Sequence, residues 1–329
     1  GHPAGDLLEY VQGLGEVWSA QLLAARLRAE GEAVDWLDAR AVLVISPSAL
    51  GAVVDWAESG RRLAAWRASH TAPRVVVTGF VARDTDGRIT TLGRNGSDYS
   101  GAIFARLFAA AELHIWTDVD GVLSADPRLV PEAILLPRMS YDEAFELAYF
   151  GAKVVHPRTM GPVLEAGIPV WVRNTFNPDC PGTRIGPEHE DGAGPVKGLT
   201  IAREMALVEV EGTGMIGVPG TAERVFGALR DAGVSVVMIA QASSEHSICC
   251  VVREADAARA AEVLRRAFAR ELDAGLLQAV DVERGIAVLA AVGDGMSGHT
   301  GIAARLFSEL ARAEVNVRAI AQGGTERNI

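Results

Sequence analysis

The chain has 329 residues, of which 49% are hydrophobic, and a formal net charge of −11 at pH 7. This length predicts two or three domains with a sizeable core. The negative charge, without any run of lysine or arginine, argues against nucleic acid and anionic membranes as partners. The cysteines, Cys180, Cys249 and Cys250, are too few for a disulfide framework, which favours a reducing compartment. No apolar run is long enough to span a membrane, and the N-terminus has no signal-peptide pattern.

The first 80 residues predict alternating helices and strands. Leu22, Leu23 and Leu27 follow a helical period and predict a helix over residues 16–30 that ends at Gly31. The next expected elements are strands at 34–37 and 41–45, a helix at 53–67 and an almost wholly apolar strand at 74–80. This alternation is typical of an α/β fold with a mostly parallel sheet.

The stretch 92–101 predicts a strand end, a tight turn and the start of a helix. A Gly/Asn/Gly turn precedes Ser97 and Asp98, which are good N-cap residues, and apolar side chains then follow at helical spacing: Ile103, Phe104, Leu107 and Phe108. A helix start attracts an anion, and Arg94 can bind a carboxylate with two parallel hydrogen bonds. With Asp98 four residues away, the turn offers a partner for each charge of an amino acid. The alternative is an ordinary capped turn with a surface ion pair.

An acidic loop follows an expected strand at residues 114–117. Its carboxylates are Asp118, Asp120 and Asp126. Such a cluster is neutralised by a cation or by the donors of a ligand, and a magnesium nucleotide supplies both. The alternative is a solvated acidic loop that ends in an Asp-Pro turn.

The remaining sequence predicts a helix, a strand, a linker and a repeat. Ser140 and Glu143 form a capping-box pattern for a helix that ends near Gly151, and a strand is expected at 168–172. Residues 174–198 are rich in Pro, Gly and acidic side chains, which indicates a linker. Residues 220–248 then match 301–329 at a shift of 81 (301 − 220), each copy reading strand, Gly-rich turn, helix, strand.

Together these stretches resemble the amino-acid kinase superfamily, and within it the aspartokinases. The matching motifs run along nearly the whole chain: Gly15-Glu16 with Trp18-Ser19-Ala20-Gln21, Thr78-Gly79-Phe80, the two stretches above, Phe150-Gly151-Ala152-Lys153, His156-Pro157-Arg158-Thr159 and Pro181-Gly182-Thr183. The chain looks like the aspartokinase part of threonine-sensitive bifunctional aspartokinase/homoserine dehydrogenases of bacteria and plants. The resemblance implies an amino-acid kinase domain at residues 1–194, followed by tandem α+β ACT domains at 195–285 and 286–329.

The resemblance also implies a reaction, the transfer of the γ-phosphoryl group of ATP to the β-carboxylate of L-aspartate, with ATP and Mg²⁺. This is the first step toward lysine, threonine, methionine and isoleucine. The acceptor is already ionised, so positioning and charge neutralisation replace a general base. The implied aspartate contacts are Glu16, Phe80, Arg94, Ser97 and Asp98, of which Arg94 and Asp98 form the catalytic pair. The implied nucleotide contacts are Thr117, Asp118, Leu123, Arg128 and Lys153, with Leu123 where relatives often carry a tyrosine.

For the repeat, the resemblance implies an allosteric site for a small amino acid. In threonine-sensitive relatives the effector contacts include the Ile-x-Gln of each copy, here Ile239 with Gln241 and Ile320 with Gln322. A buried amide binds a hydroxyl or a carboxylate, which fits L-threonine better than lysine. We also expect a homodimer or higher oligomer through the ACT domains. The expected location is the cytoplasm, or the plastid in a plant.

Two departures from the family pattern and three alternatives stay open. The N-terminal Lys-Phe-Gly-Gly-Thr-Ser loop of the family has no counterpart in these residues, and the dehydrogenase half is absent. We therefore expect little or no kinase turnover from this chain as written. One alternative is a kinase for glutamate, acetylglutamate or UMP, and another is a catalytically silent threonine-binding fragment that self-associates. A dinucleotide-binding fold is disfavoured because no Gly-x-Gly-x-x-Gly follows an expected strand.

Overall fold

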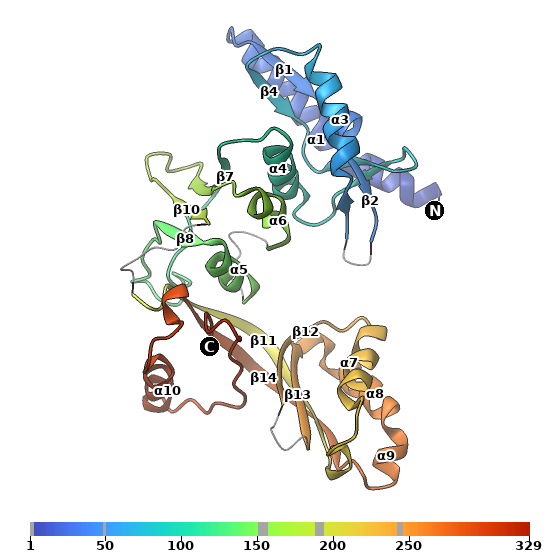
Figure 1. Ribbon diagram of the computed structural model, residues 1–329, viewed down its shortest axis with the longest axis vertical. Helices are drawn as coiled ribbons and strands as arrows, with labels where there is room; N and C mark the ends of the chain where they lie inside the picture. The colour runs from blue at the N-terminus through green and yellow to red at the C-terminus, as the bar shows by residue number, and fades with distance from the viewer. Residues whose placement is uncertain (1–2, 49–50, 151–156, 188–193, 242–245) are drawn as a thin grey trace. The chain divides into compact units, whose positions relative to one another are not determined.

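The computed structural model describes residues 3–48, 51–150, 157–187, 194–241 and 246–329. The chain forms two compact units (Figure 1). The first comprises the residues up to Val122, Leu135–Phe145 and the described part of Lys153–Glu190, and the second comprises the others. Among the helices in these ranges, none has the length and hydropathy needed to cross a bilayer.

The first unit alternates helices with short strands, which confirms the α/β class. Its helices are α1 (Pro3–Ala29), α2 (Ala39–Val42), α3 (Trp56–Arg67), α4 (Gly96–Leu107), the first part of α5 (Tyr141–Tyr149) and α6 (Pro157–Ala166). Its strands are β1 (Val34–Leu37), β2 (Val44–Ser46), β3 (Val53–Val54), β4 (Arg74–Val77), β5 (Val81–Asp84), β6 (Ile89–Thr91), β7 (Leu113–Thr117), β8 (Arg138–Ser140), β9 (Val170–Asn174) and β10 (Thr183–Gly186).

Parallel pairing joins strands that are distant in sequence, as expected. The parallel pairs are β1 with β4, β2 with β5, β7 with β9 and β8 with β10. The strand orders are β1-β4, β3-β2-β5-β6 and β7-β9-β10-β8. Buried Leu37, Leu43, Val81 and Ile103 belong to one core cluster that joins α4 to the strands.

Helix α1 is longer than predicted and faces its strands with different residues. It begins at Pro3 and not at residue 16, and it ends, as predicted, before Gly31, whose φ of +88° is a left-handed stop. Its buried face consists of the small residues Gly13, Val17, Ala20 and Ala24, while Leu22 is 71% exposed. Small side chains let a helix approach neighbouring strands closely.

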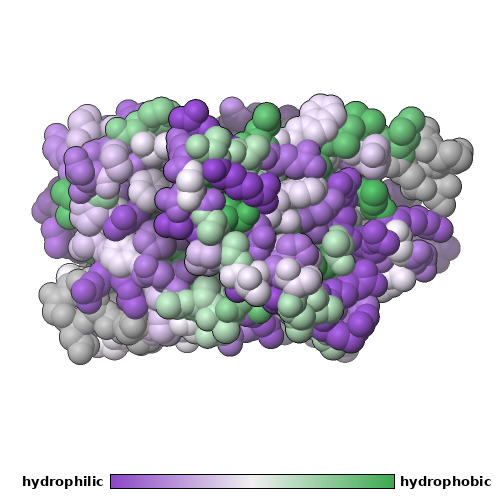
Figure 2. Space-filling model, turned by 90° about the horizontal axis from the view of Figure 1, so that it is seen from above, coloured by the Kyte–Doolittle hydropathy of each residue, from purple (hydrophilic) through white to green (hydrophobic). Residues whose placement is uncertain are grey.

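On the face drawn in Figure 2, hydrophobic residues lie in small groups between hydrophilic ones.

Three further expected boundaries in the first unit are wrong, and side-chain caps explain two of them. The strand predicted at 41–45 begins only at Val44, because the Asp38 carboxylate accepts a hydrogen bond from the Arg40 N–H and opens the short helix α2. The helix predicted at 53–67 begins at Trp56, because the Asp55 carboxylate accepts from the Glu58 N–H. The strand predicted at 74–80 ends at Val77.

The capping box is confirmed, and the expected linker contains a strand. Ser140 Oγ accepts from the Glu143 N–H at 3.1 Å, and Glu143 Oε2 accepts from the Ser140 N–H at 3.0 Å. Within residues 174–198, β10 pairs with β8 and β9. The buried Thr183 fixes this strand, since its hydroxyl donates to the Leu136 carbonyl at 2.7 Å and accepts from the Val122 N–H at 2.8 Å.

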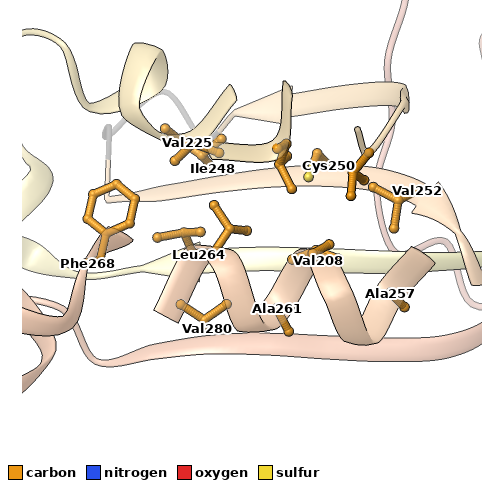
Figure 3. Close-up of a cluster of buried hydrophobic side chains, with 14 of the residues drawn as sticks. Val208, Val225, Ile248, Cys250, Val252, Ala257, Ala261, Leu264, Phe268 and Val280 are labelled. Atoms are coloured by element: carbon orange, nitrogen blue, oxygen red, sulfur yellow. The ribbon is translucent and has the colours of Figure 1, made fainter. Parts of the chain in front are cut away.

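The second unit is built around one antiparallel sheet in the order β12-β13-β11-β14. Its strands are β11 (Gly198–Glu211), β12 (Val236–Gln241), β13 (Ser247–Arg253) and β14 (Ala279–Val292). Its helices are α7 (Thr221–Asp231), α8 (Ala257–Ala267), α9 (Ala269–Asp273) and α10 (Ile302–Arg312), with 3₁₀ turns η1 (Thr213–Met215), η2 (Glu254–Asp256) and η3 (Asp294–Met296). Figure 3 shows side chains of α8, among them Ala261 and Leu264, packed with the strand residues Val208 and Val280.

The repeat predicted from sequence is an internal structural repeat. The long strands β11 and β14 are equivalent at the shift of 81 and pair antiparallel with each other, Gly198 opposite Val292 and Glu211 opposite Ala279. The backbone hydrogen bond from Gly212 N to His246 O, 2.9 Å, has its counterpart from Gly293 N to Arg327 O, 3.0 Å. The two copies are therefore related by an approximate two-fold axis between the long strands.

The second copy lacks the final strand that the sequence pattern predicts. The counterpart of β12 has no regular structure in residues 317–322, although Ala291 and Ile329 exchange two backbone hydrogen bonds. In the first copy β12 pairs with β13, and only the first two positions of that partner have counterparts, Asn328 and Ile329, in the sequence given. The ladder of the first copy has no counterpart in residues 317–322, and α10 buries none of its side chains fully.

Candidate functional site

The main candidate site lies at the turn between β6 and α4 in the first unit. The predicted order of strand, turn and helix is confirmed, but the cap differs from the prediction. Asn95 is the N-cap residue, in a left-handed conformation with φ of 58°, and makes no side-chain cap bond. The Ser97 hydroxyl instead donates to Glu16 Oε1 of α1 at 3.2 Å. The helix start is thus tied to α1 and not to its own backbone.

A pocket of about 570 Å³ opens at this turn. It brings together all five residues assigned to aspartate from sequence; its lining is Gln12, Gly15, Glu16, Ser19, Phe80, Gly93, Arg94, Asn95, Gly96, Ser97 and Asp98. Sequence reasoning missed Gln12 and Ser19. Their spacing from Glu16, four residues before it and three after it, places all three on one face of a helix, and this was the signal available.

The charges in this pocket are arranged for a ligand that carries both signs. In the part of the chain that the structure describes, no ion pair or hydrogen bond engages the Arg94 guanidinium or the Asp98 carboxylate. The Asp98 residue is exposed as a whole, but its carboxyl faces the pocket, where partial loss of water raises its pKa. Glu16 adds a second carboxylate, already held by Ser97. The set offers one cationic and two anionic partners.

Of the residues assigned to the nucleotide, Thr117 and Asp118 are adjacent at the end of β7. The Thr117 hydroxyl donates to Asp118 Oδ1 at 3.1 Å, and the Thr117 carbonyl accepts from the Thr175 N–H. Neither residue lines the pocket at α4. Asp118 is exposed, so its carboxylate is accessible to a ligand.

The acidic cluster predicted after β7 does not form. Asp120 Oδ1 accepts from Asn174 Nδ2 at 2.7 Å and from Asn177 Nδ2 at 3.1 Å. Asp126 is paired with Arg128 in a two-bond contact that lowers the pKa of this carboxyl to about 2. Protein donors therefore engage two of the three acids without a metal ion, the Asn174 and Asn177 amides at Asp120 and the Arg128 guanidinium at Asp126, which the spacing of the acids alone does not reveal.

The other nucleotide assignments are less defined by the structure. Leu123 and Arg128 belong to the second compact unit, where Leu123 is half-buried and Arg128 is exposed. Lys153 lies outside the described residues. Across the described ranges no group of three or more His, Cys, Asp or Glu side chains is placed to hold a metal ion. A magnesium ion that arrives on nucleotide phosphates needs only one or two protein carboxylates, for which Asp118 is suited.

Two smaller pockets occupy equivalent positions in the repeat. The first, about 260 Å³, lies between the turn 217–222 and Gln241, and the second, about 250 Å³, lies between 298–303 and Gln322. Gly220 and Gly301, which precede the helices, both have φ of 88°. The predicted Gln241 and Gln322 line these pockets, but Ile239 and Ile320 do not and are 50% and 55% exposed.

Family comparisons match both parts of the chain. Residues 4–174 match the amino acid kinase family, and residues 208–268 and 289–329 match an ACT domain. The first match covers more than half of the 329 residues. Both ACT matches include the long strands or their ends and the turns that form the two small pockets.

Individual relatives agree with these family matches. The chain is 48% identical to the chloroplastic bifunctional aspartokinase/homoserine dehydrogenase of Daucus carota, over 100% of this chain and 37% of that protein. The crystal structure of Clostridium acetobutylicum aspartate kinase has a TM-score of 0.85 at 27% identity, covering 97% of this chain and 71% of that one. Escherichia coli aspartokinase III with aspartate and ADP has a TM-score of 0.78 at 30% identity, covering 98% and 71%. With lysine and aspartate its TM-score is 0.76.

Proposed function

We propose, from the premise that the chain belongs to the amino acid kinase family, that its parent protein is an aspartate kinase. The reaction is the ATP-dependent phosphorylation of the L-aspartate β-carboxylate to 4-phospho-L-aspartate, the entry to the aspartate-derived amino acids. The chain spans 37% of the carrot relative, so the activity is proposed for the whole protein. Its compartment, cytoplasm or plastid, stays a prediction.

The observation that carries this proposal is the pocket at α4. A free amino acid presents a carboxylate and an ammonium group on one carbon, and the pocket presents the Arg94 guanidinium together with Asp98 and Glu16. We assign the α-carboxylate to Arg94 and the ammonium group to Asp98 and Glu16. The E. coli neighbour was crystallised with aspartate and ADP, which supports a dicarboxylic amino acid as the ligand class.

The reaction requires positioning more than proton transfer. A β-carboxylate oxygen attacks the γ-phosphorus, a new O–P bond forms, and the bond to the bridging oxygen breaks so that its electron pair leaves with ADP. No proton needs removal, since the acceptor is ionised at neutral pH. Arg94, Asp98 and Glu16 would fix the substrate, and Asp118 and Thr117 would hold the nucleotide. Magnesium, when bound with ATP, supplies neutralisation of phosphate charge.

We further propose that the two small pockets bind an amino-acid effector, with L-threonine as the first candidate. The first pocket is lined by Gln241, by Thr221 and by the turn of three glycine and proline positions before α7. A primary amide and backbone N–H groups bind a hydroxyl and a carboxylate without a charged side chain. Lysine is present in one structure of the E. coli neighbour, so it is the competing effector to test.

The test uses the full-length protein with ATP and magnesium against aspartate, glutamate, acetylglutamate and UMP. Release of ADP in the presence of aspartate, but not of the other three acceptors, supports the proposal. Preference for another acceptor overturns it. Calorimetric titration with threonine and with lysine then tests the effector. Threonine binding without any binding of magnesium ATP or aspartate would favour a purely regulatory protein.

A further inference from the structure

The backbone at Phe80 adopts a conformation that side chains rarely take. Its φ is +67°, and the Val81 N–H donates to the Gly79 carbonyl at 2.7 Å, two residues back. A three-residue turn with positive φ at its centre is the rare form of the γ-turn and is strained. Phe80 also lines the pocket at α4. Strain at a wall of the pocket calls for a structural cause.

Three contacts hold Phe80 in this turn. Its N–H donates to Ser100 Oγ at 2.7 Å, and its carbonyl accepts from the Leu92 N–H at 2.8 Å. Its ring covers Gly96 so closely that a Cβ added there would lie 2.6 Å from Phe80 Cδ2. The main chain and the ring of Phe80 are thus fixed against the turn and first residues of α4.

Ser100 is the link between the strained turn and the helix. Its hydroxyl, while accepting from Phe80, donates to the Gly96 carbonyl at 2.8 Å, and the residue is 3% exposed. The same side chain therefore contacts residue 80 and the first turn of α4, which carries Ser97 and Asp98. An alanine at this position satisfies neither partner, because it offers neither a donor nor an acceptor.

We propose that Ser100 is a positioning residue for the aspartate pocket, acting through the backbone of Phe80 and the start of α4. Ser100 does not line the pocket and touches no substrate. It holds the Phe80 wall at a fixed distance from Arg94 and Asp98, and so sets the space for the substrate side chain. This inference rests on the proposed aspartate kinase function.

The test compares Ser100→Ala with Ser59→Ala in the full-length protein. Ser59 is the matched control, because it is also fully buried and its hydroxyl also bridges backbone groups, the N–H and carbonyl of Val44. Ser59 does not line the pocket. Both variants lose a buried hydroxyl. Only Ser100→Ala is expected to raise KM for aspartate, by about tenfold, while KM for ATP stays unchanged.

Two outcomes of this comparison overturn the proposal. The first is an unchanged KM for aspartate in Ser100→Ala, and the second is an equal rise for aspartate and ATP, which would indicate general loosening. Ser100→Thr keeps the hydroxyl and is expected to restore most of the affinity for aspartate.

A double-variant cycle covers the case in which Ser100→Ala does not fold. Glycine adopts positive φ without strain, so Phe80→Gly removes the need for a clamp. The Phe80→Gly, Ser100→Ala double variant still leaves the residue-80 N–H and the Gly96 carbonyl without their hydroxyl partner, but it no longer carries the strain. It is therefore expected to fold and to melt below Phe80→Gly alone. If the double variant also fails to fold, relief of strain at residue 80 does not compensate for the loss of Ser100, and the link through Phe80 is wrong.

Direct aspartate binding separates this inference from the proposed function. If the unmodified full-length protein neither binds nor phosphorylates aspartate, the function is wrong. If it does both and Ser100→Ala binds aspartate equally well by calorimetry, the function stands and the role of Ser100 is wrong.

Discussion

The pocket at α4 and the paired pockets of the repeat are lined by different parts of the chain. The first presents charged side chains, Arg94 and Asp98 from the turn and start of α4 and Glu16 from α1. The first repeat pocket has no ionisable side chain in its described lining and is formed by a turn, a helix start and Gln241. The second repeat pocket adds His299 and Glu326 to the same turn and helix start. The comparison teaches that the two repeat pockets share their backbone turn and their glutamine, whereas the pocket at α4 is defined by its charged side chains.

The largest expected effect is at Arg94. Arg94→Ala removes the guanidinium that we assign to the substrate carboxylate, and kcat/KM for aspartate is expected to fall roughly 100-fold, about 3 kcal/mol. Arg94→Lys is the control, because it keeps the charge but loses the two-pronged geometry, and an intermediate loss is expected. Steady-state kinetics with varied aspartate measures both. Equal activity of Arg94→Ala and the unmodified protein would remove the contrast between the pockets.

The next effect tests the backbone origin of the repeat pockets. A Cβ at Gly212 would lie 2.6 Å from Leu277 Cα, and one at Gly293 would lie 2.3 Å from the Pro195 carbonyl. Both glycines have φ of 172°, so the cost is steric. Gly212→Ala and Gly293→Ala are each expected to lower the free energy of unfolding by about 1–3 kcal/mol.

Gly227→Ala is the control for these two variants. It lies inside α7, and its nearest contact would be Glu223 Oε1 at 3.7 Å. Urea unfolding is expected to show a gain of roughly 0.5–1 kcal/mol for this variant. A loss in Gly212→Ala without one in Gly293→Ala would show that the two copies are not built alike.

Effector binding sharpens the comparison further. Gln241→Ala and Gln322→Ala each remove the amide that lines a pocket, and each is expected to weaken threonine binding about tenfold. Ile239→Ala and Ile320→Ala are the controls, because these side chains lie outside the pockets and a smaller change is expected. Threonine titrations of the full-length variants measure this. A larger effect at the isoleucines would move the site away from the pockets.

The smallest expected effect is a pH dependence confined to the pocket at α4. Burial raises the pKa of Asp98, and only its ionised form attracts the substrate ammonium group. As pH falls toward this raised pKa, KM for the substrate aspartate is expected to rise by about two- to threefold. The rise is expected to begin at a higher pH than it would if the Asp98 side chain had the pKa of an exposed aspartate. Glu16 and Arg94 face the same pocket, and Arg94 stays charged throughout.

Asp98→Asn is the control for the pH profile. The substrate's own β-carboxylate titrates at about 3.9, and the variation left in this variant belongs to groups other than Asp98. An unchanged profile would contradict the role of Asp98. Threonine binding at the pocket lined by Gln241 is expected to lack this acid-side change, because none of the described residues that line that pocket is titratable.

Local signals in the sequence were sufficient for several features of the fold. The capping box of Ser140 and Glu143, the strand at residues 34–37 and the helix stop at Gly31 depend on neighbours in sequence, and all three are confirmed. The repeat was visible because equivalent positions keep their residue types. The five residues assigned to aspartate were found through the family motifs that contain them, and all five line the pocket at α4.

Other features depend on contacts that no local pattern encodes. The Asp120 carboxylate accepts hydrogen bonds from Asn174 and Asn177, more than fifty residues away in sequence. A residue that looked like an ion ligand in the sequence therefore joins two loops by hydrogen bonds. The Ser97 hydroxyl contacts Glu16 of α1 in place of its own helix. The positive φ of Phe80 is held by tertiary contacts that outweigh local preference.

The two copies of the repeat also contact each other at the ends of the long strands. The Gly214 N–H in η1 donates to the Leu276 carbonyl at 2.9 Å, just before β14. At the equivalent position in η3, a Cβ added to Gly295 would lie 3.0 Å from Pro195 Cα, just before β11. The 3₁₀ turn beside each small pocket therefore contacts the segment that leads into the opposite copy's long strand. A ligand that displaces one turn also displaces this segment. We therefore expect binding at the two small pockets to be coupled, so that a titration shows one midpoint concentration and not two.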